Sequence, residues 1–93
     1  MSFEIKYHPD VKEIDIPLID LRTKKRIKKA IETRLVISPH QYGEPLRKTL
    51  KGYWKLRVGD YRVVFKVVKN EILILGIIHR KNVYDKIKKR TDS

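Results

Sequence analysis

The stretch 53–79, YWKLRVGDYRVVFKVVKNEILILGIIH, decides the fold of this chain. Polar and apolar residues alternate from Tyr53 to Val58, which is typical of a half-buried strand. Gly59-Asp60 follows as a two-residue hairpin signal, because glycine adopts the positive backbone angle that such turns need. Two further strands are apolar at almost every position, as central strands are: Tyr61–Val68 and Ile72–His79. The stretch therefore predicts a three-stranded antiparallel meander.

The tight turn fixes the register of the first two strands, and the register fixes which side chains share a face. We expect Val58 to lie opposite Tyr61, and Arg57 opposite Arg62. One face then carries apolar side chains for helices to cover: Trp54, Leu56, Val58, Tyr61, Val63 and Phe65. The other face is cationic: Tyr53, Lys55, Arg57, Arg62, Val64 and Lys66. If the second turn is Asn70-Glu71, His79 falls opposite Arg62 on the cationic face.

The residues before the meander predict one strand and a first short helix. Phe3, Ile5 and Tyr7 alternate with polar residues, as in a strand. Pro9-Asp10 suits the first turn of a helix, where the missing proline N–H would be unpaired anyway. The buried stripe of this helix is predicted from three apolar residues: Val11, Ile14 and Leu18.

A longer helix is predicted from residue 18 to 37, starting near Pro17, which ends the first one. Its buried stripe is Ile27, Ile31 and Leu35 with Ala30, and its other face is densely cationic. Residues 38–51 are expected to form a loop, with one strand-like stretch at 46–50. Residues 83–90 are expected to be a basic tail or a last helical turn. The whole chain, 1–93, is thus predicted to be one α+β domain.

The charge of the chain indicates an anionic partner. Lys and Arg number 23 against 11 Asp and Glu, a formal net charge of +12 in 93 residues. There is no cysteine, which excludes disulfides, thiolate zinc sites and a cysteine nucleophile. The first residues lack the apolar core of a signal peptide, and the longest apolar run, 72–78, is too short to cross a bilayer. We therefore expect a cytoplasmic protein without a membrane partner.

The stretch 50–67, LKGYWKLRVGDYRVVFKV, followed by ILGIIHRKNVY, resembles the RelE/ParE superfamily of toxins. The motif consists of Arg57, then Asp60-Tyr61-Arg62, then His79-Arg80 and finally Val83-Tyr84. The order of elements matches too: a strand, a helical hairpin, a three-stranded meander forming one sheet, and a short C-terminal tail or helix. The resemblance implies a toxin that a cognate acidic antitoxin neutralises.

RelE-like members cleave messenger RNA in the ribosomal A site without a metal or a small-molecule cofactor. ParE-like members instead inhibit DNA gyrase by binding, and the two types share the fold. The resemblance implies the following catalytic residues: Lys55, Arg62, His79, Arg80 and Tyr84. Further RNA-binding residues are expected to be Arg57, Lys66 and Lys81. Glu44, in the loop before the meander, is a remote candidate for a carboxylate base.

Cleavage of this kind uses the substrate's own 2′-hydroxyl as nucleophile. It needs a base, positive charge for the phosphorane, and an acid for the leaving 5′-oxygen. The guanidinium fork of Arg62 fits two phosphate oxygens. Histidine titrates nearest neutral pH, so His79 is a candidate acid or base, with Lys55 as the alternative base. Arg80 is expected at the leaving oxygen or on a neighbouring phosphate, and Tyr84 on a base or beside the hydroxyl.

Overall fold

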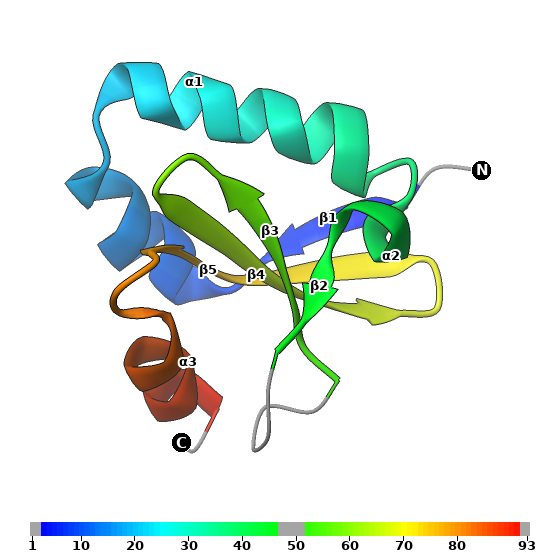
Figure 1. Cartoon of the computed structure of the whole chain (residues 1–93). Helices are drawn as coiled ribbons and strands as arrows, with labels where there is room; N and C mark the ends of the chain where they lie inside the picture. The colour runs from blue at the N-terminus through cyan, green and yellow to red at the C-terminus, as the bar shows by residue number, and fades with distance from the viewer. Residues whose placement is uncertain (1–2, 47–51, 92–93) are drawn as a thin grey trace.

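The computed structural model describes residues 3–46 and 52–91, and shows a sheet covered by helices on both faces (Figure 1). The sheet has five strands in the order β1-β5-β4-β3-β2. Their bounds are β1 Glu4–Tyr7, β2 Glu44–Pro45, β3 Trp54–Val58, β4 Tyr61–Val68 and β5 Glu71–His79. The strand β1 is parallel to β5, while β2 to β5 pair antiparallel. The predicted α+β fold with its meander is confirmed, and β2 is an additional short strand.

The β3–β4 hairpin has the register that Gly59-Asp60 predicts. Val58 pairs with Tyr61, and Arg57 with Arg62. Gly59 has φ of +59°, a left-handed conformation that glycine adopts without steric cost. The apolar face of this hairpin packs into the main core, as predicted. The cationic residues consequently lie on the opposite face.

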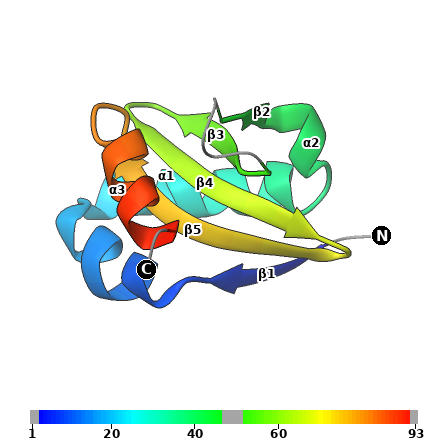
Figure 2. The ribbon, with the colours of Figure 1, turned by 90° about the horizontal axis from the view of Figure 1, so that it is seen from below.

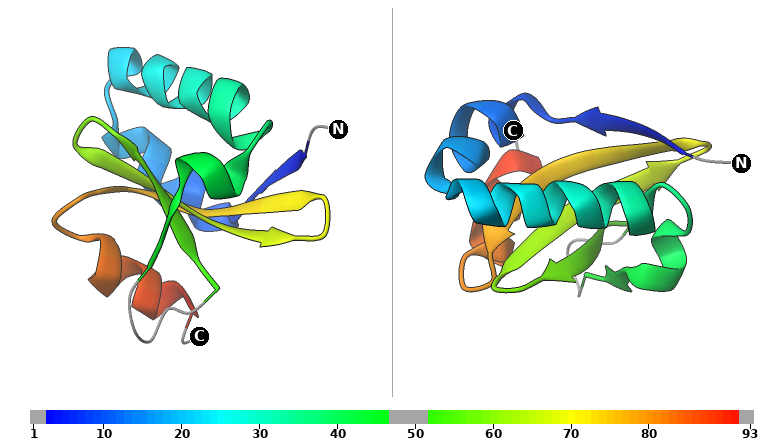
Figure 3. Two further views of the ribbon diagram at one scale, coloured as in Figure 1. Left: turned by 45° about the vertical axis from the view of Figure 1, so that its right-hand side comes forward. Right: turned by 90° about the horizontal axis from the view of Figure 1, so that it is seen from above.

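The helix α1, Leu21–Ala30, continues through the wider turns of η3, Ile31–Leu35, and lies across the apolar face of the sheet (Figure 3). It starts three residues later than predicted, because the Asp20 side chain caps it by accepting a hydrogen bond from the Thr23 N–H at 3.2 Å. This hydrogen bond also lowers the pKa of Asp20. The predicted stripe is confirmed, since its members are all buried: Ile27, Ala30, Ile31 and Leu35.

The first helical segment consists of η1, Val11–Asp15, and the tight turn η2, Ile16–Leu18. Val11 is buried as predicted, but Ile14 and Leu18 are 46% and 70% exposed. The prediction for these two residues is wrong because a wide turn followed by a tight one does not keep the helical period. The inward position belongs instead to the carboxylate of Asp15, which is 2% exposed.

The loop predicted from 38 to 51 contains the single turn of α2, Pro39–Tyr42, and then β2. Gly43 joins the two, and a Cβ atom on it would lie 2.7 Å from the Phe65 ring. Within the strand-like stretch predicted at 46–50, only Leu46 is described. It is buried, and its N–H bonds to the Tyr53 carbonyl at 2.9 Å.

The C-terminal helix α3, Val83–Thr91, lies against the face of the sheet opposite α1 (Figure 2). It encloses a second, smaller core with the underside of the sheet: Leu46, Val64, Leu75, Ile78, Val83 and Ile87. The face predicted to be cationic is therefore partly apolar and covered. No helix in the described part of the chain is long and apolar enough to cross a membrane.

Candidate nucleic-acid interface

Three of the predicted cations meet in one pocket at the β2–β3 edge of the sheet, which we call the strand pocket. Lys55, Arg57 and Arg62 all line it. It has a volume of about 210 Å³. Helical segments and β2 contribute residues that the meander does not contain: Arg34, Tyr42 and Glu44. The short strand β2 pairs with Lys55 and Trp54 of β3, which places Glu44 beside the pocket.

Arg62 is held in place by the turn that precedes it. Its Nη1 atom donates to the carbonyl oxygens of Gly59 at 3.1 Å and Tyr61 at 2.9 Å. These bonds fix the guanidinium while leaving the edge formed by Nε and Nη2 for a ligand. A fixed guanidinium edge binds two oxygens of one phosphate, which is the role that the sequence predicts for Arg62.

A second hollow, the helix pocket, adjoins the strand pocket and shares Arg34 and Arg57 with it. It has a volume of about 260 Å³ between α1 and the tip of the β3–β4 hairpin. Arg26 and Lys29 of α1 add two further cations. The Arg26 guanidinium lies against the hairpin, since a Cβ on Gly59 would be 3.2 Å from its Nη1 atom.

The cations of these two pockets have no acidic partner among residues 3–46 and 52–91. The ion pairs there involve other groups: Lys6–Glu71, His8–Asp10, Arg90–Asp10 and Arg90–Asp15. Arg57 and Arg62 even stand directly opposite each other on adjacent strands. Such like-charged pairs destabilise a sheet, so the arrangement favours a polyanionic ligand that neutralises them.

Glu44 is the carboxylate of the strand pocket. The β2–β3 pairing places Glu44 directly opposite Lys55. No sequence pattern predicts this pairing, because β2 has only two residues and shows no periodicity. The pocket thus brings a proton acceptor beside an ammonium group and two guanidinium groups.

His79 lies elsewhere, and the predicted register of β5 is wrong. His79 pairs with Tyr61 rather than Arg62, and the two rings meet edge to face with centroids 5.8 Å apart. The turn falls at Lys69-Asn70, one residue earlier than predicted, and Leu75 has no partner on β4. Together, the earlier turn and the bulge shift the pairing of β5 with β4 by one residue relative to the prediction. The β5 side chains beyond the bulge therefore lie on the face opposite to the predicted one. The structure does not bring His79 into the strand pocket.

The remaining predicted residues do not line the strand pocket. The Arg80 N–H bonds to the Asp60 carbonyl at 2.8 Å, which places Arg80 beside the hairpin tip. Tyr84 is 41% exposed on α3. The Lys66 Nζ atom lies 5.4 Å from the centroid of the Tyr53 ring. Lys66 is four residues along β4 from Arg62, about 13 Å away. Lys81 is exposed beyond the end of β5.

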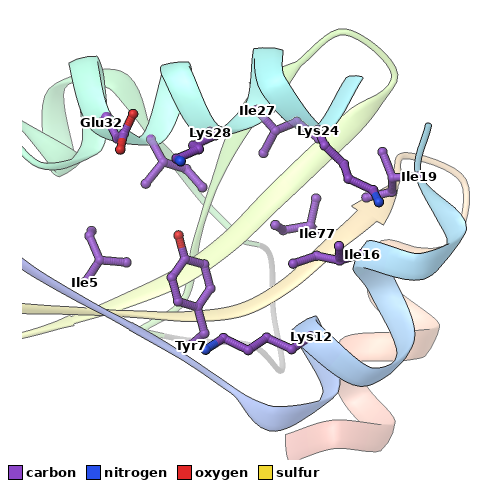
Figure 4. A pocket seen from close by; sticks show the side chains of 11 residues that line it. Ile5, Tyr7, Lys12, Ile16, Ile19, Lys24, Ile27, Lys28, Glu32 and Ile77 are labelled. Atoms are coloured by element: carbon purple, nitrogen blue, oxygen red, sulfur yellow. The ribbon is translucent and has the colours of Figure 1, made fainter. Parts of the chain in front are cut away.

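A third pocket, of about 320 Å³, has a different chemistry (Figure 4). Its wall is formed mainly by isoleucines of the sheet, of η2 and the residue after it, and of α1 and η3: Ile5, Ile16, Ile19, Ile27, Ile31 and Ile77. Tyr7 points from β1 toward α1 at its centre (Figure 4). Burial, and to a smaller extent the charge of Glu32, raise the pKa of Tyr7, so this phenol stays protonated at neutral pH. Three lysines, Lys12, Lys24 and Lys28, also line this pocket, but isoleucines form most of its wall.

Comparisons with known proteins identify the family and the fold of the chain. A family model described as the ParE toxin of the type II toxin-antitoxin system parDE matches residues 5–84. The chain belongs to this toxin family. Toxin RelE3 of Methanocaldococcus jannaschii is 39% identical over 41 residues, which are 41% of this chain and 47% of that protein. The match thus spans about half the length of that relative.

Solved structures of RelE-type toxins share the fold of this family member. The RelBE2 toxin-antitoxin complex of Mycobacterium tuberculosis gives a TM-score of 0.79 at 22% identity, covering 86% of this chain and 100% of that one. The RelB-RelE complex of Methanococcus jannaschii gives a TM-score of 0.67 at 25% identity, covering 87% of this chain and 96% of that one. A variant of Escherichia coli toxin RelE in the free state gives a TM-score of 0.74 at 16% identity, covering 97% of this chain and 98% of that one. The predicted membership of the RelE/ParE superfamily is confirmed.

Proposed function

We propose that this toxin is an endoribonuclease that cleaves messenger RNA, in the ribosomal A site, by attack of the substrate's 2′-hydroxyl. The observation that carries the proposal is the strand pocket. It gathers Lys55, Arg57 and Arg62 around one carboxylate, Glu44, with no ion pair to neutralise the cations in the described part of the chain. A protein that binds without chemistry has no need of a proton acceptor among its phosphate ligands.

The reaction assigns one task to each group. Glu44 accepts the proton of the 2′-hydroxyl as the 2′-oxygen attacks the adjacent phosphorus. Arg62 binds two oxygens of the phosphorane and stabilises the charge that develops there. The bond from phosphorus to the 5′-oxygen then breaks, and Lys55 donates a proton to this oxygen. The products are a 2′,3′-cyclic phosphate and a free 5′-hydroxyl.

The other predicted residues serve binding in this scheme. Arg80, beside the hairpin tip, and Tyr84, on α3, contact the RNA on either side of the cleaved bond. His79 pairs with Tyr61 on the other face, so it takes no part in proton transfer. A cognate acidic antitoxin would neutralise the toxin by covering the cations of the pocket.

Mapping of messenger RNA ends after induction of the toxin tests this proposal. We expect transcripts with new 5′-hydroxyl ends, and we expect Arg62→Ala to abolish both the cuts and the growth arrest. Glu44→Gln should lower the rate by about 10²-fold or more, the usual contribution of an acid–base group. Arg22→Ala, which removes an exposed cation outside both pockets, is the matched control and should cleave normally.

The alternative function is inhibition of DNA gyrase without RNA cleavage, which the description of the matching family as a ParE toxin favours. Intact transcripts together with inhibition of purified gyrase in a supercoiling assay would establish this alternative and reject the nuclease. Cuts that persist in Arg62→Ala would instead reject the assignment of the strand pocket.

A further inference from the structure

Tyr42 is an exposed aromatic side chain in a pocket that is lined by four cations and one carboxylate. It is 47% exposed at the end of α2 and lines the strand pocket together with Arg34 and Arg57. An exposed ring between cations is the usual composition of a site for single-stranded nucleic acid, where bases stack and phosphates pair.

The backbone around Tyr42 is held firmly, so the position of the ring is built into the fold. Pro39, at the start of α2, is buried. His40 packs on Trp54 with ring centroids 4.7 Å apart. Gly43 follows against the Phe65 ring, too close for any side chain. The single turn of α2 is therefore anchored to the core on both sides of Tyr42.

The cations continue from Tyr42 along one side of the helix. Arg26, Lys29 and Arg34 lie three and five residues apart, and all three line the helix pocket. The row is about 12 Å long at the usual helical rise. Each nucleotide of a stacked strand advances about 3.4 Å along the helix axis, so the row matches the axial rise of about three nucleotides.

We propose that the helix pocket and the Tyr42 side of the strand pocket form one RNA subsite next to the cleaved bond. Tyr42 stacks on a base, Arg34 and Arg57 bind the adjoining phosphate, and Arg26 and Lys29 bind the next phosphates. The proposal rests on the proposed function in one respect, which is that the polyanion is RNA.

A protein segment fits these pockets less well than RNA does. The apolar residues in their walls, Leu56, Val58 and Ala30, are 2%, 5% and 7% exposed. Apart from Tyr42, the two pockets therefore expose little apolar surface that a protein segment could bury. The pocket on the other side of α1 has an apolar wall of isoleucines, and these two do not.

The experiment measures binding of a fluorescein-labelled 2′-O-methyl RNA to the purified toxin by fluorescence anisotropy. This probe lacks the 2′-hydroxyl and is not cut. We expect Tyr42→Ala to weaken binding about tenfold, and Tyr42→Phe to bind as the wild type does, because stacking needs the ring and not the hydroxyl. Tyr42→Leu, which keeps an apolar side chain without a π-face, should behave as Tyr42→Ala does.

The phosphate contacts are measured in the same assay from the dependence of binding on salt. Arg34→Ala should lower the slope of log K against log salt by about one, the value for one lost phosphate contact. The wild type should bind an eight-nucleotide probe more tightly than a four-nucleotide probe, and the double variant Arg26→Ala/Lys29→Ala should bind the two probes with similar affinity. Lys25→Ala, an exposed α1 lysine outside both pockets, is the matched control and should change neither quantity.

The outcomes separate this inference from the proposed function. If Arg62→Ala weakens binding while the Tyr42 and Arg34 variants do not, the subsite is wrong and the nuclease stands. If the Tyr42 and Arg34 variants weaken binding but the wild type cuts no RNA, the subsite stands and the nuclease is wrong. Unchanged RNA binding with lost affinity for the purified cognate antitoxin would show a protein-binding site and overturn the inference.

Discussion

Arg90, at the end of α3, and Arg34, near the end of η3, are both arginines close to the C-terminal end of a helix, yet their surroundings differ. The Arg90 side chain is 7% exposed. Its two terminal nitrogens donate to Asp15 at 2.6 and 2.8 Å, and Nη1 also donates to the Leu75 carbonyl at 2.8 Å. Arg34 is exposed and forms no ion pair with any described residue.

The contrast distinguishes cations that stabilise the fold from cations that are available to bind a ligand. Asp15 binds Arg90 and accepts the Ile77 N–H at 2.9 Å, so one carboxylate joins η1, β5 and α3. The hydrogen bond with Asp15 raises the pKa of Arg90. On the α1 and β3 side, several cations surround a single carboxylate, Glu44, and none of them forms an ion pair within the described residues. The excess positive charge there is available to an added anion.

The largest expected effect on stability comes from breaking the ion pair between Arg90 and Asp15 beneath α3. Arg90→Ala should lower the free energy of unfolding by about 3–5 kcal/mol, because it leaves the buried Asp15 without its cation. Urea denaturation of the purified proteins measures this difference. Lys89→Ala, on an exposed neighbour in the same helix, is the control and should change stability by less than about 0.5 kcal/mol. Equal stability of the two variants would show that Arg90 is not structural.

A smaller effect is expected from crowding where α3 crosses β5. A Cβ on Gly76 would lie 2.6 Å from Ile78 Cδ1, 2.9 Å from Ile87 Cδ1 and 3.0 Å from Arg90 Nη1. Gly76→Ala should therefore lower the free energy of unfolding by about 1–3 kcal/mol, the usual cost of overpacking.

A double variant tests whether overpacking causes the loss of stability in Gly76→Ala. Ile78→Val removes the nearest of the three atoms, so Gly76→Ala/Ile78→Val should be more stable than the sum of the two single changes predicts. Urea denaturation of all four proteins gives the coupling energy. Strict additivity would mean that Gly76 is needed for another reason than the close approach of α3.

The sequence predicted the hairpin well because its determinants are local. Gly59-Asp60 fixes the turn, and the turn alone fixes that Arg57 faces Arg62. The buried stripe of α1 was equally readable, since Ile27, Ile31 and Leu35 keep a helical period. Three of the predicted cations consequently meet in the strand pocket.

The errors arose where distant segments decide the outcome. No local pattern marks Leu75 as the unpaired residue of a bulge, and the face of His79 depends on it. Asp15 is buried because Arg90 reaches it across 75 positions of sequence. Tyr42 and Glu44 lie in elements too short to show periodicity, so their place in the strand pocket emerged only from the packing of α2 and β2 against the sheet.

The smallest expected effect on stability has the opposite sign and concerns the cations of the strand pocket, which form no ion pairs with described residues. Arg57→Gln should raise the free energy of unfolding by about 0.2–1 kcal/mol, because it removes the repulsion from Arg62 directly opposite. The gain should shrink as salt screens the charges, since the Debye length falls to about 10 Å at 0.1 M. Arg57→Lys keeps the charge and should show no such gain. If Arg57→Gln is instead less stable than the wild type at low salt, the guanidinium supports the hairpin, and the distinction between cations that stabilise the fold and cations that await an anion fails at this position.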